Sequence, residues 1–252
     1  MSIPFMQQLD LLIKQSDIVL EVVDARFPEK TRNKNVEERI VGKGKQLIIA
    51  LNKADLSTKE KISYDKKMLI QEGFRVVFVS AKERKGINLL KREIGIAKGK
   101  KTEITIGLLG YPNSGKSSLI NALSGSGKGK VRTSSKAGFT RGLQKIKISE
   151  GIYLLDAPGI IPYGEKDEFS LFLVGSKNAN QVHDFENVAL KLIMEIGLEK
   201  IAQVFGLEFS GEDEEELLEK IAIKKNWLMK GGTGDIRKAS REILEMYQKN
   251  LI

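Results

Sequence analysis

The fold of this chain is decided by the stretch ITIGLLGYPNSGKSSL, residues 104–119. Its first part, Ile104–Leu109, is apolar and rich in β-branched residues, which predicts a buried strand. The next part, Gly110–Ser117, matches the pattern G-x-x-x-x-G-K-[ST], and a helix-like run, Lys116–Leu123, follows it. Glycines let such a loop wrap around a phosphate, so that main-chain N–H groups and the helix N-terminus face the phosphate oxygens. The flanking strand and helix favour a phosphate-binding loop over a chance glycine-rich turn.

Similar apolar runs recur on both sides of this stretch, and helix-like segments separate most of them. Strands that alternate with helices imply crossover connections and a mostly parallel sheet covered on both faces. We therefore predict a doubly wound α/β domain with a six-stranded, mostly parallel sheet over residues 1–169. The expected strands are Ile18–Val23, Leu47–Leu51, Val76–Val79, Ile104–Leu109, Ile146–Ile148 and Ile152–Leu155, and the expected helices are Lys59–Glu72, Ile87–Ile94 and Lys116–Leu123.

The last third of the chain carries a helical pattern instead. Apolar residues recur at steps of three and four over Val182–Ile196, which predicts one helix. A second helix is expected to begin with a cap at Ser210, followed by an acidic run, and to continue through Leu228. A third is expected to begin near Asp235. Residues 170–252 are therefore expected to form a small C-terminal helical domain.

The composition limits the classes of protein to which the chain can belong. It has 252 residues, of which 41% are hydrophobic and 30% charged, with five prolines, as is typical of a globular protein. The absence of cysteine excludes disulfides and thiolate metal sites, and the single histidine excludes a multi-histidine metal site. No apolar run approaches the roughly 20 residues of a membrane span, and the N-terminus lacks the features of a signal peptide. We expect a cytoplasmic protein without a membrane partner.

The charge is distributed unevenly along the chain. The net charge is +9, and residues 181–252 hold 10 basic and 14 acidic residues, a net of −4, which leaves +13 on residues 1–180. Between Ser126 and Ile148 stand seven basic residues and no acidic one, mostly in a glycine-rich loop. Such a run is either a solvated loop or a contact surface for a polyanion such as nucleic acid.

A second motif, Asp156-Ala157-Pro158-Gly159, follows the last expected strand. Lys116 is expected to neutralise β- and γ-phosphate oxygens, and the Ser117 hydroxyl to bind Mg²⁺. Asp156 can hold the same ion from the other side through water, and the Gly159 N–H can sense a γ-phosphate. Thr140, in the basic loop, is the candidate for a second hydroxyl ligand. The motifs predict a site for a nucleoside triphosphate, whose further expected contacts are Asn113, Ser114, Gly115, Ser118 and Pro158.

Two short motifs earlier in the chain concern the base. Asn52-Lys53-Ala54-Asp55 follows an expected strand, and the Asp55 carboxylate can accept hydrogen bonds from guanine N1–H and the 2-amino group. Adenine has neither donor and would leave the carboxylate desolvated and unpaired. Ser80-Ala81-Lys82 can complete the pocket with a backbone N–H to guanine O6. These motifs predict GTP and GDP as the ligands.

The order of these motifs is similar to that of circularly permuted GTPases of the YlqF/YawG type, which include RbgA-like ribosome-assembly factors. In an ordinary GTPase the phosphate loop comes first, whereas here Asn52–Asp55 and Ser80–Lys82 precede it. Asp24–Pro28 with Arg32-Asn33 resembles the D-A-R-x-P…R-N segment of that family. Gly231–Ala239 resembles its C-terminal G-G-x-x-D-x-x-x-A element. The resemblance covers nearly the whole chain.

The resemblance implies a protein that hydrolyses GTP to GDP and acts as a nucleotide switch on a ribonucleoprotein, with ribosomal RNA or the large ribosomal subunit in assembly as its partner. We expect it to be a monomer. The basic loop is consistent with this partner, because Lys and Arg neutralise RNA phosphates. No aromatic RNA-binding signature is present, so recognition by shape and backbone is expected, and no reading of DNA sequence. Two alternatives stay open: a GTP-regulated RNA-binding scaffold, and a GTPase that acts on a different RNA or on a protein.

The expected catalytic residues are Lys116, Asn113, Thr140 and Gly159. Ile160 stands where many GTPases have a glutamine that orients the attacking water, so slow intrinsic hydrolysis is expected. The family resemblance implies that Asn113 helps to hold K⁺ beside the developing charge, although it can instead only shape the loop. Arg26 and Arg32 are alternative sources of positive charge, and they are equally well explained as surface contacts with phosphate.

Overall fold

The chain divides into two compact units, Met1–Tyr163 and Gly164–Ile252. The structure is a computed structural model, and it describes residues 5–125, 144–156, 167–211, 213–249 and 251–252. Each unit has its own buried core and is described by itself. No helix among these residues has both the length and the apolar character that a bilayer crossing requires.

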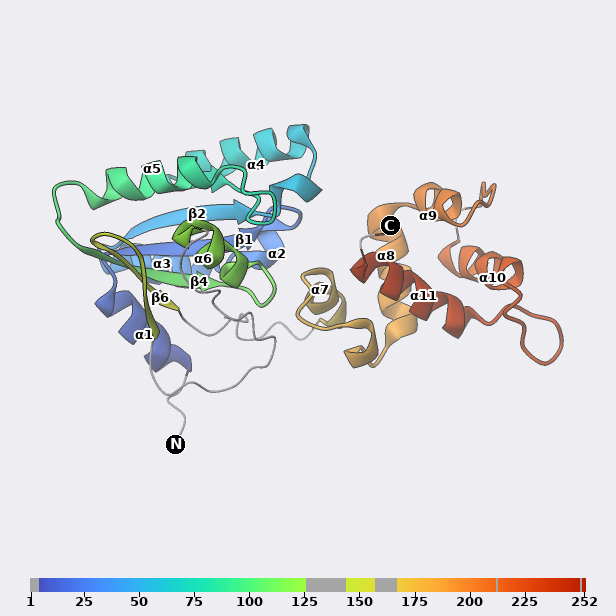
Figure 1. The fold of residues 1–252 in the computed structure, drawn as a ribbon. Helices are drawn as coiled ribbons and strands as arrows, with labels where there is room; N and C mark the ends of the chain where they lie inside the picture. Colours follow the sequence, from blue (N-terminus) through green and yellow to red (C-terminus); the bar gives the residue numbers. More distant parts are fainter. Residues whose placement is uncertain (1–4, 126–143, 157–166, 212, 250) are drawn as a thin grey trace. The chain divides into compact units, whose positions relative to one another are not determined.

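The first unit is built on a six-stranded sheet (Figure 1). The strands lie in the order β3-β2-β1-β4-β6-β5, and all neighbours are parallel except β5, which is antiparallel to β6. All six expected strands are present, and the predicted mostly parallel sheet is confirmed. Their bounds are β1 Ile18–Asp24, β2 Gln46–Asn52, β3 Arg75–Phe78, β4 Ile104–Gly110, β5 Gln144–Ser149 and β6 Ile152–Asp156.

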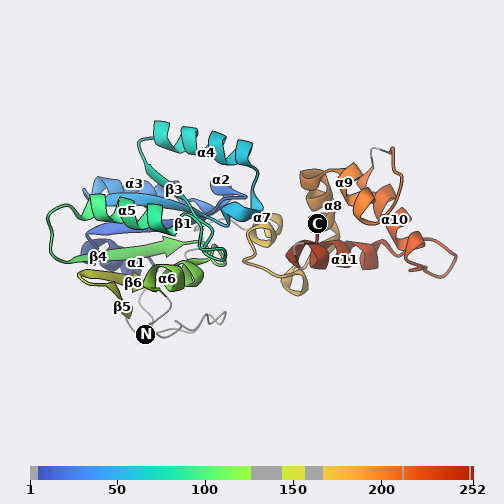
Figure 2. The same ribbon diagram turned by 45° about the horizontal axis from the view of Figure 1, so that its top comes forward.

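Helices cover both faces of this sheet, and Figure 2 shows the same layers from a second side. On one face α5 (Ile87–Lys98) and α6 (Lys116–Ser124) pack on alternate strand residues. On the other face α1 (Phe5–Gln15), α3 (Lys34–Gly42) and α4 (Lys59–Gln71) do the same. Helix α1 and helix α3 were not predicted from the sequence, although buried Leu9, Leu12 and Ile13 recur in α1 at helical spacing. A short helix, α2 (Pro28–Thr31), and a 3₁₀ turn, η1 (Ala54–Leu56), follow β1 and β2.

The strand register brings the predicted motifs to one edge of the sheet. Asp24 at the end of β1 pairs with Asn52 at the end of β2, and Val22 pairs with Gly110 at the end of β4. Asp156, at the end of β6, pairs with Leu108. In parallel α/β sheets, ligands bind at the carboxyl ends of the strands. Asp24, Asn52, Gly110 and Asp156 all lie at this edge.

Helices are the main elements of the described part of the second unit. It consists of α7 (Glu168–Leu173), η2 (Ala179–Gln181), α8 (Phe185–Ile196), α9 (Leu198–Val204), α10 (Glu214–Lys224) and α11 (Ile236–Gln248). The core includes Phe172, Leu192 and Ile243, which are fully buried, and helix α8 packs on helix α11. Asp235 caps α11 by accepting from the Lys238 N–H, so the predicted third helix is confirmed.

The predicted limits of two of these helices are wrong. Helix α10 is capped by Asp213, which accepts from the N–H groups of Glu215 and Glu216, and not by Ser210. It ends before Asn226, where the backbone turns into the left-handed region with φ of 58°. Leu228 therefore lies outside the helix and is half exposed. The first predicted helix begins at Phe185, three residues later than expected, because Asp184 caps it.

Candidate nucleotide site

The predicted phosphate loop connects β4 to α6, and two of its glycines are required by the backbone. Gly110 has φ of 146°, and a Cβ there would lie 2.4 Å from the Val22 carbonyl oxygen. Gly115 has φ of 94°, and a Cβ there would lie 2.1 Å from Asn52 Nδ2. Both positions combine a conformation that disfavours side chains with a close neighbour, so only glycine fits.

The side chains of the loop are arranged around its main chain. Lys116 Nζ donates to the carbonyl oxygens of Gly110 and Tyr111, at 2.8 and 2.7 Å. The Ser114 side chain is buried, and its Oγ has no hydrogen-bond partner in the described part of the chain. Asn113 is exposed and has a left-handed backbone with φ of 60°. The loop leads directly into a helix, its Lys116 side chain folds back onto the main chain, and its buried Ser114 hydroxyl has no partner in the described part. These features are those of a site for an anionic ligand such as a phosphate.

Asn52 joins three of the predicted motifs. Its side chain is buried, and Nδ2 donates to the Ser114 carbonyl oxygen at 2.8 Å. Its Oδ1 accepts from the Ala81 N–H at 3.0 Å. Ser114 lies 62 residues and Ala81 lies 29 residues from Asn52 along the chain. One amide group therefore fixes the phosphate loop and both predicted base-recognition segments relative to each other.

The remaining residues of the Asn52 motif follow in a tight turn. Lys53 has a left-handed backbone with φ of 62°, and its Nζ donates to Asp24 Oδ2 at 2.7 Å. The Ala54 N–H donates to the Val79 carbonyl oxygen at 3.1 Å, which joins this turn to the end of the next strand. Asp55 lies in η1 with its side chain exposed, so its carboxylate is accessible to a ligand.

The segment after β3 is a closed turn. Ser80 and Lys85 exchange two main-chain hydrogen bonds, at 3.0 and 3.1 Å, and Ser80 Oγ accepts from the Glu83 N–H at 3.1 Å. Gly86 ends the turn with φ of 73°. Lys82 is exposed. The turn holds Ala81 where its N–H meets Asn52.

Part of the predicted site lies outside the described residues. This applies to Thr140, Pro158 and Gly159, to Ile160, and to most of the basic loop. The backbone of Asp156 is described at the end of β6, but its side chain is not. Ser117 and Ser118 occupy the first turn of α6, where the Ser117 side chain is half buried and Ser118 is exposed. Of the three expected Mg²⁺ ligands, the structure thus describes the side chain of Ser117 alone.

The two arginines considered as sources of positive charge are both paired. Arg26 Nε and Nη2 donate to the carboxylate of Asp24 at 3.0 and 2.8 Å. Arg32 is buried and donates to both oxygens of Glu37 and to Glu72, so it is not a surface contact for phosphate. Asp24 was not predicted to be a functional residue, although it opens the D-A-R-x-P segment.

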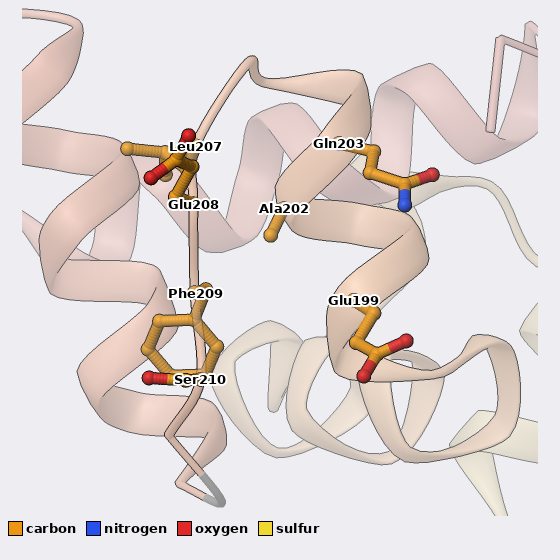
Figure 3. A pocket seen from close by; sticks show the side chains of 7 residues that line it. All are labelled: Glu199, Ala202, Gln203, Leu207, Glu208, Phe209 and Ser210. Atoms are coloured by element: carbon orange, nitrogen blue, oxygen red, sulfur yellow. The ribbon is translucent and has the colours of Figure 1, made fainter.

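The second unit contains a surface pocket of about 570 Å³ that includes none of the predicted site residues (Figure 3). Helix α9 lines one side, and the extended segment after it lines the other. Two carboxylates and one aromatic ring give the pocket its chemical character. The lining residues are Glu199, Ala202, Gln203, Leu207, Glu208, Phe209 and Ser210.

Comparisons with known families match both halves of the chain. A family model described as "50S ribosome-binding GTPase" matches residues 105–221, starting on the strand that leads into the phosphate loop. A model described as "Ferrous iron transport protein B" matches residues 7–94. The match to residues 7–94 ends within α5 and the match to residues 105–221 begins within β4, so the guanine motifs fall in one and the phosphate loop in the other.

Similar proteins match almost the whole chain. An uncharacterized GTP-binding protein of Methanocaldococcus jannaschii is 39% identical over 251 residues, 98% of this chain and 65% of that protein. Nucleolar GTP-binding protein 2 of Saccharomyces cerevisiae is 32% identical over 254 residues, 97% of this chain and 51% of that protein. The chain therefore spans between half and two thirds of the length of these relatives.

Solved structures extend the similarity to the fold. GNP-bound YlqF from T. maritima matches with a TM-score of 0.65 and 26% identity, over 97% of this chain and 93% of that one. A GDP-bound structure of TM YlqF matches with a TM-score of 0.67 and 26% identity, over 96% and 94% of the two chains. The match includes both units of the chain, because it covers nearly all of its length.

Proposed function

Because the chain belongs to the YlqF-like family of circularly permuted GTPases, we propose that it binds GTP and GDP and hydrolyses GTP to GDP. The observation that carries the proposal is the pair of hydrogen bonds of the Asn52 side chain, which donates to Ser114 O and accepts from the Ala81 N–H. They hold the phosphate loop against the segments that select guanine. A site of this kind recognises both ends of a guanine nucleotide.

The roles of the residues follow from their chemistry. Asp55 accepts from the guanine edge, and the segment Ser80–Lys82 supplies a main-chain N–H to guanine O6. Lys116 leaves its carbonyl partners for the phosphate oxygens, and the loop N–H groups with Ser114, Gly115 and Ser118 surround them. Ser117, Thr140 and Asp156 are proposed to hold Mg²⁺, which would neutralise charge on the β- and γ-phosphates. Pro158 and Gly159 are proposed to contact the γ-phosphate.

Hydrolysis is proposed to be slow without a partner, because Ile160 cannot orient a water molecule. Asn113 is proposed to help place K⁺ beside the charge that develops in the transition state. Its exposed position at the tip of the phosphate loop supports this role, since a cation can approach it from solvent. The other proposed catalytic groups are Lys116, the Gly159 N–H and Thr140, and Thr140 would act as a ligand of Mg²⁺.

The proposed partner is ribosomal RNA, within the large ribosomal subunit in assembly. The description of the matched family names 50S ribosome binding, and the name of a curated relative places it in the nucleolus. Within the acidic second unit, residues 224–241 hold six basic residues and one acidic residue, Asp235, which caps α11. We call residues 224–241 the basic segment.

Aromatic rings order several cations of the basic segment. Arg241 lies 4.5 Å from the ring centroid of Phe185, and Lys238 lies 5.2 Å from that of Trp227. Lys225 lies 5.6 Å from the ring centroid of Phe205. Contact with an aromatic face restricts the positions that a cation can take while its charge stays available to phosphate oxygens, which supports binding to the RNA backbone.

GTP turnover by the purified protein tests this function, in KCl and in NaCl, each with and without isolated large ribosomal subunits. We expect a low basal rate that rises with K⁺ and again with subunits. Asn113→Ala should remove the K⁺ effect and keep GDP binding. Tight GTP binding without turnover in any of these conditions would contradict hydrolysis and favour the GTP-regulated scaffold. Turnover that subunits do not stimulate would point to a different RNA or protein partner.

A further inference from the structure

Asp24, the last residue of β1, holds two cations with one buried carboxylate. Its Oδ2 accepts from Lys53 Nζ at 2.7 Å and from Arg26 Nη2 at 2.8 Å, while Oδ1 accepts from Arg26 Nε at 3.0 Å. Asp24 is fully buried, whereas the Lys53 side chain is 24% exposed. Burial acts to raise the pKa of Asp24, but the hydrogen bonds and charges of Arg26 and Lys53 outweigh it and lower that pKa below its ordinary value. The carboxylate is therefore charged at neutral pH.

The main chain fixes Asp24 against the same motif. The Ala25 N–H donates to the Asn52 carbonyl oxygen at 2.7 Å, and the Asp24 N–H donates to Thr31 Oγ1 at 3.0 Å. Asp24 and Asn52 also pair in the register of β1 and β2. The Lys53 side chain is thus fixed at both ends: its backbone is left-handed and follows Asn52, and its ammonium group donates to Asp24.

We propose that Asp24 is a positioning residue for guanine-nucleotide binding, which acts by holding the Lys53 side chain in place as one wall of the base pocket. The inference rests on the proposed function. Lys53 stands between Asn52 and Asp55, and with its ammonium held, its methylene stem presents an apolar surface to the face of the purine. A free lysine side chain would lose rotamer freedom when the base binds, and Asp24 removes that loss in advance.

A purely structural ion pair is the competing explanation, and the chain contains a matched control for it. Asp10 also pairs with one arginine and one lysine, Arg39 at 2.6 Å and Lys43 at 2.6 Å. This cluster lies on the surface. It joins Asp10 of α1 to Arg39 of α3 and to Lys43, which follows α3 directly. Asp10→Asn thus removes the same charge from a cluster of the same composition, away from the carboxyl edge of the sheet.

A double-mutant cycle on fluorescent GDP binding tests the inference, with Asp24→Asn, Lys53→Met and the double variant. Asparagine keeps the size of Asp24 and can still accept from the Arg26 N–H, which favours folding. We expect Asp24→Asn to weaken GDP binding about 10-fold, and Lys53→Met at least as much. The double variant should bind within about twofold of Lys53→Met, because Asp24 has nothing left to position. Asp10→Asn should bind GDP like the unmodified protein.

Unchanged GDP affinity in Asp24→Asn, or losses that multiply in the double variant, would overturn the inference. If Asp24→Asn lacks a cooperative melting transition, the GDP affinity of Lys53→Arg is compared with that of Lys53→Met to test the inference. A guanidinium can still reach Asp24, so Lys53→Arg should retain most of the affinity that Lys53→Met loses, and equal losses would overturn the inference. An unmodified protein that binds no guanine nucleotide would overturn the proposed function instead.

Discussion

At the scale of single residues, the site depends on a contact between a glycine and an amide. Gly115 lies so close to Asn52 that a Cβ would sit 2.1 Å from Nδ2. That amide group joins the phosphate loop to the Ala81 turn, and any displacement of it separates the two ends of the nucleotide site. The close approach explains why the motif needs glycine at this position, in addition to its φ of 94°.

Gly115→Ala should therefore abolish nucleotide binding, with a loss of GDP affinity of about 100-fold or more, because the loop and Asn52 cannot both keep their positions. Fluorescence titration measures this loss. Gly125→Ala is the matched control: it lies at the other end of α6 with φ of 76°, but nothing lies within 4 Å of its added Cβ. The control should lose about 1 kcal/mol of stability and keep its GDP affinity. Equal loss in both variants would contradict the role of the contact.

At the scale of elements, a buried arginine holds the segment after β1 to α4. Arg32 Nε and Nη2 donate to Glu37 at 2.9 and 2.7 Å, and Nη2 also donates to Glu72 at 2.7 Å. Glu21 lies beside this group, where burial and the nearby Glu37 raise its pKa well above the ordinary value. Removal of the cation would leave the buried Glu37 carboxylate without a counter-ion, which is among the most destabilising changes to a protein interior.

Arg32→Met should lower the free energy of unfolding by about 3–5 kcal/mol, measured in urea at pH 7. The control is Arg39→Met, which breaks an exposed pair with Asp10 and should change stability far less, because solvent screens that pair. If the two variants lose similar stability, the buried network does not stabilise the first unit in the way its geometry indicates.

An acidic residue at the start of α7 predicts a pH dependence of the second unit. Glu168 accepts from Lys177 and from the N–H groups of His183 and Asp184, and these bonds, chiefly that of Lys177, lower its pKa from the ordinary 4.5 to about 2. The charged form thus stabilises the fold fully above pH 4.5, and this stabilisation declines as the pH falls from 4.5 through about 2. Glu168→Gln should cost about 1 kcal/mol at pH 7 and markedly less near pH 2, where about half of the Glu168 carboxyl groups are protonated, as measured by calorimetry at several pH values. A constant difference would contradict the charge effect.

The sequence allowed the strands to be predicted, because each is a short apolar run between polar segments. It did not allow the Asn52 contacts or the Arg32–Glu72 pair to be predicted, since their partners lie 29 to 62 residues away and meet only through the strand order. The start of α10 was misplaced for a local reason: Ser210 and Asp213 are both good capping residues, and only the structure distinguishes them. The site motifs were recognisable because the chemistry restricts each to few residue types.

At the scale of the whole molecule, charge is separated between the two parts of the sequence. Residues 1–180 carry +13 and residues 181–252 carry −4, yet the basic segment stands within the acidic part. Net attraction to RNA would come mostly from the first part, and the cations of the basic segment would add to binding where the second part also touches the polyanion. Removal of cations from the basic segment can therefore distinguish direct contact by this part from general attraction.

The variant Lys225/Lys230/Lys238→Gln should weaken binding to large ribosomal subunits about 10-fold near physiological salt. It should also flatten the plot of log affinity against log salt by about 0.7–0.9 for each phosphate that the protein no longer neutralises. Filter binding over a range of KCl concentrations measures both. Lys191/Lys200/Lys220→Gln makes the same change in charge in the same unit but outside the basic segment, so it should shift affinity little and leave the slope unchanged. Equal effects of the two triple variants would mean that only the total charge of the unit matters, and would place the RNA contacts elsewhere.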